Sequence, residues 1–308
     1  MTEKSKEQNK FYQIVTVLRE SFSLLKRNDP LRLAGATAFF TTFALPPIIF
    51  ILAQLFGSLI GKEEINKGLM GNISEILGKD AAKPVRQVLK SIHGFSNEWY
   101  ILVLGFLFLV FISTTLFLVI KNSLNQIWKI STVDHPGFLF YLISRAKAFC
   151  IILLTGFLLC VGIFLESMEV VAGNYLNSLL KIGTFDFKFI FSRIGSIIVI
   201  ALWFIFLFHY LADGRPKWKA TIAGGSITSI LFMIGKWVLK ILLIDTNIGK
   251  IYGTSGSFVL ILLFVFYCSF ILYYGACFIS VYSSKKEWLI IPRNRAYSYR
   301  IQKIKKTL

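Results

Sequence analysis

Histidine and carboxylate groups, on which most enzyme active sites depend, are scarce in this sequence. Only three histidines occur among 308 residues, and His93, His135 and His209 lie in three separate regions. No carboxylate lies near the centre of a long apolar run, and there is no glycine-rich phosphate loop, no His-Glu-x-x-His and no Gly-x-Ser-x-Gly. General acid-base and metal-dependent chemistry need such groups in clusters. We therefore expect no catalytic residues, metal site or cofactor, and we interpret His209, at the end of an apolar run, as an interfacial packing residue.

Cysteine is also rare. The four cysteines, Cys150, Cys160, Cys268 and Cys277, all lie in apolar runs and lack the spacing of a metal site. We predict no disulfide from them. A free cysteine in such surroundings behaves as a small apolar residue, so packing is the expected role.

Long apolar runs are what the sequence has in abundance. Hydrophobic residues make up 55% of the chain. An α-helix rises about 1.5 Å per residue, so about 20 apolar residues cross the hydrocarbon layer of a membrane. Six runs have about this length: Leu33–Ile60, Trp99–Ile120, Ala148–Leu165, Phe189–Leu211, Ala220–Ile244 and Phe258–Val281. The sequence therefore predicts an all-α, polytopic membrane protein with six transmembrane helices in residues 31–282.

Positive charge is distributed unevenly between the connections. The net charge is +18, and 22 of the 34 lysines and arginines fall in residues 1–32, 121–147, 215–219 and 285–308. The alternate connections contain only nine. Because cytoplasmic connections are enriched in lysine and arginine, both termini are predicted to be cytoplasmic. The charge thus indicates membrane topology, and no specific nucleic-acid partner is expected.

Three polar segments flank or interrupt the runs. Residues 1–30 are predicted to form a cytoplasmic arm, in which Phe11–Leu25 has the apolar spacing of an amphipathic helix that lies in the membrane interface. A partner protein that binds such helices is the alternative. Apolar residues also recur at helical spacing in the outer loop, residues 61–98, which predicts amphipathic helices there. Residues 283–308 are predicted to be a basic cytoplasmic tail.

Two consecutive prolines, Pro46 and Pro47, lie at the middle of the first run. Each proline lacks an N–H donor and clashes with the preceding turn, so the pair predicts a kink or a helix break. In lipid, the freed carbonyl groups need partners from neighbouring helices or water. Two interpretations follow: a purely structural kink, or a discontinuity that lines a cavity.

Three cations lie inside the runs, where charge is costly. Lys236 and Lys240 are four residues apart and share one face of the fifth helix, and Arg193 lies near the outer start of the fourth. One interpretation is a ligand-binding basic cavity, open to the outer side, for an anionic group such as phosphate. The alternative is that each side chain extends independently to the interface.

Several short blocks follow one another in a distinctive order along the chain. They are Ala34–Pro47, Leu124–Trp128 (with Asn125 and Trp128), Arg215–Ala220, Gly224, Gly235-Lys236, Ile251–Gly253 (with Tyr252 and Gly253) and Tyr274–Ala276 (with Gly275). Taken together, these blocks resemble the YihY/BrkB family of membrane proteins. The resemblance covers roughly residues 31–282. The chain departs from the family at Cys277, where glutamate commonly follows Gly-Ala, so no role of that carboxylate carries over.

The resemblance implies a bacterial inner-membrane protein. Members of the family once carried the label of a ribonuclease, but the residues argue against a nuclease because no acid-base pair or two-metal site is visible. The leading hypothesis is a transporter-like protein that handles a lipid or another anionic amphiphile, with membrane lipids as partners. A non-catalytic structural or regulatory scaffold is the alternative, and a membrane enzyme is the least favoured.

Overall fold

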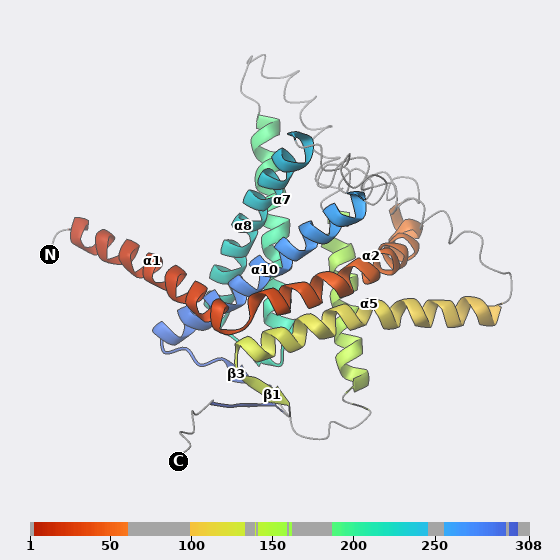
Figure 1. Ribbon diagram of the computed structural model, residues 1–308, viewed down its shortest axis with the longest axis horizontal. Coiled ribbons are helices and arrows are strands. Elements are labelled where there is room, and N and C mark those ends of the chain that lie inside the picture. The colour runs from red at the N-terminus through yellow and green to blue at the C-terminus, as the bar shows by residue number, and fades with distance from the viewer. Residues whose placement is uncertain are drawn as a thin grey trace.

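Long helices dominate the structure (Figure 1). The computed structural model describes residues 3–60, 99–132, 139, 141–158, 160–161, 187–245, 256–293 and 296–300. The labelled helices are α1 (Glu3–Arg27), α2 (Pro30–Ile60), α5 (Trp99–Ile127), α7 (Phe187–Phe206), the π-helical turn η2 (Leu207–Leu211), α8 (Trp218–Asp245) and α10 (Gly256–Lys285). The labelled strands are β1 (Ile130–Thr132), β2 (Gly214–Arg215), β3 (Ile291–Pro292) and β4 (Ala296–Ser298).

Four described helices are long and apolar enough to cross a membrane. They are Leu107–Ile127 in α5, the helix Tyr141–Leu158, Trp218–Val238 in α8 and Ile261–Lys285 in α10. Ile197–Leu211 is a shorter apolar helix. The predicted helical membrane architecture is therefore confirmed for the described part of the chain, and the count of six spans stays a prediction. The helices predicted in the loop 61–98 lie outside the described residues.

Helix α2 begins at Pro30, a position where the missing N–H costs no hydrogen bond. Asp29 precedes it with a left-handed backbone (φ 51°), and its carbonyl accepts the N–H of Leu33 at 3.1 Å. From there α2 continues as one helix to Ile60 and includes both Pro46 and Pro47. The structure therefore shows one continuous helix at these prolines in place of a helix break. A kink, and a cavity lined by this part of α2, stay predictions.

Helix α1 packs part of one face against α10. Val17, Ser21 and Leu25 are buried along this face, and Tyr274 donates from its hydroxyl to the carbonyl of Leu18 at 3.2 Å. Tyr12, Ile14, Val15 and Phe22 are exposed apolar residues of the same helix. The buried residues therefore match the predicted apolar stripe only in part, because Ile14 and Phe22 belong to that stripe but are exposed. The interfacial position of α1 stays a prediction.

Glycines permit close contact between α8 and α10. A Cβ atom on Gly275 would lie 2.0 Å from Thr228 Oγ1, and one on Gly235 would lie 1.8 Å from the ring of Tyr267. Tyr267 uses this space to donate to the carbonyl of Leu231 at 2.7 Å. Small residues in membrane helices let backbones approach in this way. The hydroxyl groups of Thr37 on α2 and Tyr273 on α10 are also hydrogen-bonded in the core.

Two pairs of short antiparallel strands lie where several of the helices end (Figure 1). In the first pair, Ile130 of β1 is opposite Ser298 of β4. In the second, Gly214 of β2 is opposite Pro292 of β3. Strands β3 and β4 lie within the predicted basic tail, and their pairing attaches them to the connections that follow α5 and precede α8. The cytoplasmic position of this tail stays a prediction.

Candidate functional site

A buried carboxylate, Asp213, lies where several helices end. It follows η2 and precedes β2, in backbone that becomes extended at Ala212, where ψ is 163°. Gly214 comes next, and a Cβ atom there would lie 2.2 Å from Ile130 Cδ1, so a larger residue would require the Ile130 side chain to move. Asp213 is only 3% exposed. A buried charge is costly unless it is paired and hydrogen-bonded, so its partners determine what this position does.

Helix α5 supplies two partners of Asp213. Lys121 and Asn125 are four residues apart, so their side chains share one face of α5. Lys121 Nζ lies 2.9 Å from Asp213 Oδ2, and Asn125 Nδ2 donates to the same oxygen at 2.9 Å. Asn125 Oδ1 accepts the backbone N–H of Asp213 at 3.0 Å. Asn125, one of the residues in the family resemblance, therefore fixes both the side chain and the backbone of Asp213.

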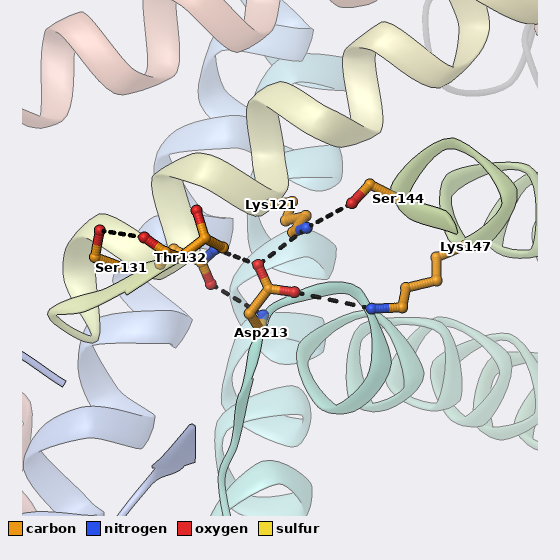
Figure 2. A network of polar contacts seen from close by, with 7 residues as sticks. Lys121, Ser131, Thr132, Ser144, Lys147 and Asp213 are labelled. Atoms are coloured by element: carbon orange, nitrogen blue, oxygen red, sulfur yellow. Dashed lines mark hydrogen bonds and ion pairs between the residues drawn. The ribbon is translucent and has the colours of Figure 1, made fainter. Parts of the chain in front are cut away.

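The helix Tyr141–Leu158 and the segment after β3 add further contacts. Lys147 Nζ lies 3.8 Å from Asp213 Oδ1, and Lys121 Nζ donates to Ser144 Oγ at 3.1 Å. Figure 2 shows Asp213 between Lys121 and Lys147. The backbone N–H of Arg293 donates to the carbonyl of Asp213 at 2.7 Å. One residue thus connects α5, the helix Tyr141–Leu158 and the segment that follows α10.

Burial makes this network a determinant of stability. The side chains of Lys121 and Asp213 are 5% and 4% exposed, so both charges have lost most of their water. A buried ion pair returns little net free energy when it forms, but removal of one partner leaves an uncompensated charge and costs about 3–5 kcal/mol. We refer to Asp213, Lys121, Asn125, Ser144 and Lys147 together as the Asp213 network.

A cavity of about 580 Å³, open to the surroundings, adjoins the Asp213 network. Its lining is rich in hydroxyl and amide groups, and Lys121 and Asp213 form part of it. The lining residues are Lys121, Asn122, Asn125, Gln126, Ile130, Ser131, Thr132, Tyr141, Asp213, Tyr297 and Tyr299. This volume fits a small polar group, with hydrogen-bond donors and acceptors on several sides.

Two other residues of the family resemblance lie near the same helix ends. Trp128 donates from Nε1 to the carbonyl of Ala276 at 3.0 Å and so joins the end of α5 to α10. Gly275 provides the close contact with Thr228 described above. Cys277, which replaces the common glutamate of the family, is fully buried and free. Tyr252 and Gly253 lie outside the described residues.

The predicted basic cavity at Lys236, Lys240 and Arg193 is not tested by the structure. Lys236 is half-buried on α8. Lys240 lies on α8 and Arg193 on α7, but their side chains are outside the described part. Convergence of these three cations therefore stays a prediction.

Two side-chain predictions have different outcomes. His209 is buried and stacks on Trp218, with ring centroids 3.9 Å apart, as expected for a packing residue. Its Nδ1 has no hydrogen-bond partner among the described residues. The predicted packing role fits Cys277, which is buried, better than Cys150, which is exposed.

Sequence reasoning missed most of the Asp213 network. Lys121 and Lys147 were assigned to a charged connection, because the second apolar run ends at Ile120. Helix α5 instead continues to Ile127. The available signals were the i, i+4 spacing of Lys121 and Asn125 and the single carboxylate between an apolar run and the Gly-Arg-Pro turn. Neither signal identifies the partner, because Asn125 and Asp213 are 88 residues apart.

Comparison with known proteins places the chain among bacterial membrane proteins. A family model described as Virulence factor BrkB matches residues 21–294. A UPF0761 membrane protein of Legionella pneumophila (strain Corby) is 24% identical over 285 residues, which are 90% of this chain and 64% of the relative. One from Verminephrobacter eiseniae is 26% identical over 264 residues, 84% of this chain and 59% of the relative.

The chain spans about three-fifths of the length of these curated relatives. No solved structure matches the chain. In the described part of the chain, no group of three or more His, Cys, Asp or Glu side chains lies close enough together to hold a metal ion.

Proposed function

This chain is a membrane protein of the BrkB virulence-factor family, and on that basis we propose that it binds and moves a lipid or another anionic amphiphile in a bacterial inner membrane. The observation that carries the proposal is the cavity of about 580 Å³ beside the Asp213 network. In this proposal the cavity receives the polar head of the amphiphile.

The border of the cavity supports an amphiphile better than a wholly polar solute. Tyr141 lines the cavity and begins the helix Tyr141–Leu158. Leu139, Leu142 and Ile143, on either side of it in sequence, are exposed apolar residues. An acyl chain lying against these side chains would leave its head group at the polar wall, where hydroxyl and amide groups satisfy it.

Lys121 is the residue of the cavity lining whose contacts an anionic ligand would change. It lines the cavity and is paired with Asp213, so an anionic head group competes with that carboxylate for the same ammonium group. A ligand changes a conformational equilibrium only when it makes different contacts in the two states. Exchange of the Lys121 contact from Asp213 to the ligand provides such a difference and would loosen the link between α5 and β2.

The test is to fill the cavity without removing a charge. Thr132→Trp places a large ring in the lining, whereas Ser298→Trp adds the same ring on β4 at an exposed residue that does not line the cavity. In vesicles containing the reconstituted protein, we expect Thr132→Trp to lower translocation of labelled phosphatidylglycerol at least fivefold and Ser298→Trp to leave it nearly unchanged. Equal rates in wild type and protein-free vesicles would reject transport of this lipid class.

A structural or regulatory scaffold is the second candidate. The Asp213 network supports it, because one buried carboxylate ties together segments that are far apart in sequence. Under this alternative the cavity-filling variant leaves lipid movement unchanged and the chain acts by holding lipids or partner proteins. We propose no catalytic activity in either case, so the purified chain should not degrade RNA.

The outer basic residues form a separate part of the transport proposal. Replacement of Lys236 and Lys240 by leucine removes both lysines while keeping the fifth helix apolar. If these residues receive the head group on the outer side, the double variant translocates phosphatidylglycerol more slowly. If the double variant inserts normally and its translocation and lipid binding are unchanged, the second site is excluded. The proposal for the cavity does not depend on this result.

A further inference from the structure

The ribbon formed by β2 and β3 presents two arginines on the same face as Asp213. Its register pairs Arg215 with Ile291, and the backbone bond from Arg293 to Asp213, 2.7 Å long, extends the antiparallel ladder by one residue pair. Residues two apart on a strand, and residues directly opposite on two strands, lie on one face of a ribbon. Arg215 and Arg293 therefore share the face on which Asp213 lies.

Lys147 brings a third cation to this face from another segment. Its Nζ lies 3.8 Å from Asp213 Oδ1, and the charges of both Arg215 and Arg293 act on it electrostatically. The Lys147 side chain is 31% exposed, Arg215 is exposed and Arg293 is half-buried. These three groups, which we call the ribbon cations, are therefore accessible to a ligand.

Asp213 carries too little charge to neutralise all three ribbon cations. Its Oδ2 already accepts from Lys121 and Asn125, and its single charge is shared with Lys147 through Oδ1. Among the described residues, no other carboxylate forms an ion pair with Lys147, Arg215 or Arg293. Three accessible cations therefore face a carboxylate that is already fully engaged, and the local potential is positive.

We propose that the ribbon cations bind a phosphate group, in particular the phosphomonoester head of an anionic lipid. The guanidinium group presents a planar fork that matches two phosphate oxygens, and lysine adds a point charge. Exposed Trp218 lies three residues after Arg215, and tryptophan is typical of the head-group level of a membrane. This site goes beyond the transport proposal, because none of the ribbon cations lines the cavity.

A paired charge-removal experiment tests the site in the full-length protein. Arg215→Gln with Arg293→Gln removes two ribbon cations and leaves the backbone pairing of β2 with β3 in place. Lys286→Gln with Arg300→Gln is the matched control, because it removes the same charge from exposed residues of the segment after α10. Dioctanoyl phosphatidic acid, dioctanoyl phosphatidylcholine and inorganic phosphate are the three probes, titrated in detergent.

We expect the ribbon double variant to bind phosphatidic acid at least tenfold more weakly, and the control to differ less than twofold from wild type. Phosphatidylcholine should bind weakly to all three proteins. Inorganic phosphate that binds as tightly as phosphatidic acid, with the same sensitivity, would support the phosphate site and identify a soluble anion as its source. Equal losses in both double variants, or no loss in either, would overturn the proposal.

The conservative pair Arg215→Lys and Arg293→Lys keeps the test decisive if the glutamine variant does not fold. It retains both charges but loses both guanidinium forks. We expect at least threefold weaker binding of phosphatidic acid, and unchanged affinity would contradict the phosphate geometry. Lipid translocation plays no part in these measurements, so their failure and a failure of the transport proposal are distinguishable.

Discussion

Asp213 and Glu20 each form an ion pair with a lysine. The nitrogen–oxygen distances are nearly equal, 2.9 Å to Lys121 and 2.8 Å to Lys285, but the surroundings differ. The first pair is buried in the Asp213 network, and the second lies on the surface, where the Glu20 side chain is 49% exposed. Distance alone therefore does not rank these pairs. Water competes for the surface pair and is excluded from the buried one.

This difference predicts unequal effects of neutralising the two carboxylates. Asp213→Asn should lower the free energy of unfolding by about 3–5 kcal/mol, because Lys121 then remains charged and buried. Glu20→Gln should lower it by less than about 1 kcal/mol. Unfolding in mixed detergent micelles measures both. Adding Lys121→Met to Asp213→Asn should restore part of the loss, and equal effects of the two single changes would contradict the assigned burial.

Glycines at two positions predict opposite responses to alanine. A Cβ atom on Gly275 would meet Thr228 Oγ1 at 2.0 Å, whereas one on Gly35 meets nothing within 4 Å. Gly275→Ala should therefore destabilise the protein by about 1–3 kcal/mol through overpacking. Gly35→Ala should leave the stability unchanged or raise it by up to about 1 kcal/mol through helix propensity. Thermal unfolding provides the comparison, and Thr228→Ala should rescue part of the Gly275→Ala defect.

At the scale of elements, hydropathy predicted where the helices lie along the chain. It did not predict where helices with polar ends stop. The fifth and sixth apolar runs begin and end within a few residues of α8 and α10. Helix α5 extends seven residues beyond its run, to Ile127, because the polar side chains of Lys121 and Asn125 are satisfied by a residue from elsewhere in the chain. Apolar periodicity contains no information about such a partner.

Sequence patterns could not predict the strands, for a different reason. Each has only two or three residues, too few for an alternating pattern to be recognised. Their pairing also joins residues about 80 to 170 positions apart, so nothing local predicts it. The cavity depends on the same pairing, since Tyr297 and Tyr299 contribute to its lining. The cavity, where we propose that a ligand binds, was thus the least predictable part of the molecule.

The register of β1 and β4 is open to a direct test. Ser131 lies opposite Tyr297, and opposed residues of antiparallel strands are close enough for a disulfide. Ser131→Cys with Tyr297→Cys should cross-link under mild oxidation, and the linked peptides should be detected by mass spectrometry. Ser131→Cys with Arg300→Cys, displaced by about 10 Å along the strand, should cross-link much less. The reverse order of yields would reject the register.

For the whole molecule, the contacts between connections constrain the topology independently of charge. β1 pairs with β4 and β2 with β3, so the connections after α5 and before α8 lie on the same side of a membrane as the segment after α10. Arg32 donates to Gln126 at 3.5 Å, which places the start of α2 with them. The sorting of lysine and arginine predicted the same grouping.

A labelling experiment tests this sidedness. Single cysteines that replace Arg32, Lys219 and Arg300 should all react with a membrane-impermeant maleimide in inside-out vesicles and not in right-side-out vesicles. A cysteine at Asn72, in the predicted outer loop, should give the opposite pattern. Reaction of any of the first three from the outer side would contradict both the charge argument and the strand pairings.

The position of β3 and β4 after the last long helix has a consequence for biosynthesis. A ribosome makes these strands after every segment with which they pair, so the ribbon and the wall of the cavity close only when translation has passed residue 298. Until then the backbone of β2 lacks its neighbour, and the carbonyl of Asp213 lacks the N–H of Arg293. A nascent chain that stops before residue 298 therefore leaves these backbone groups of β2 without their partners.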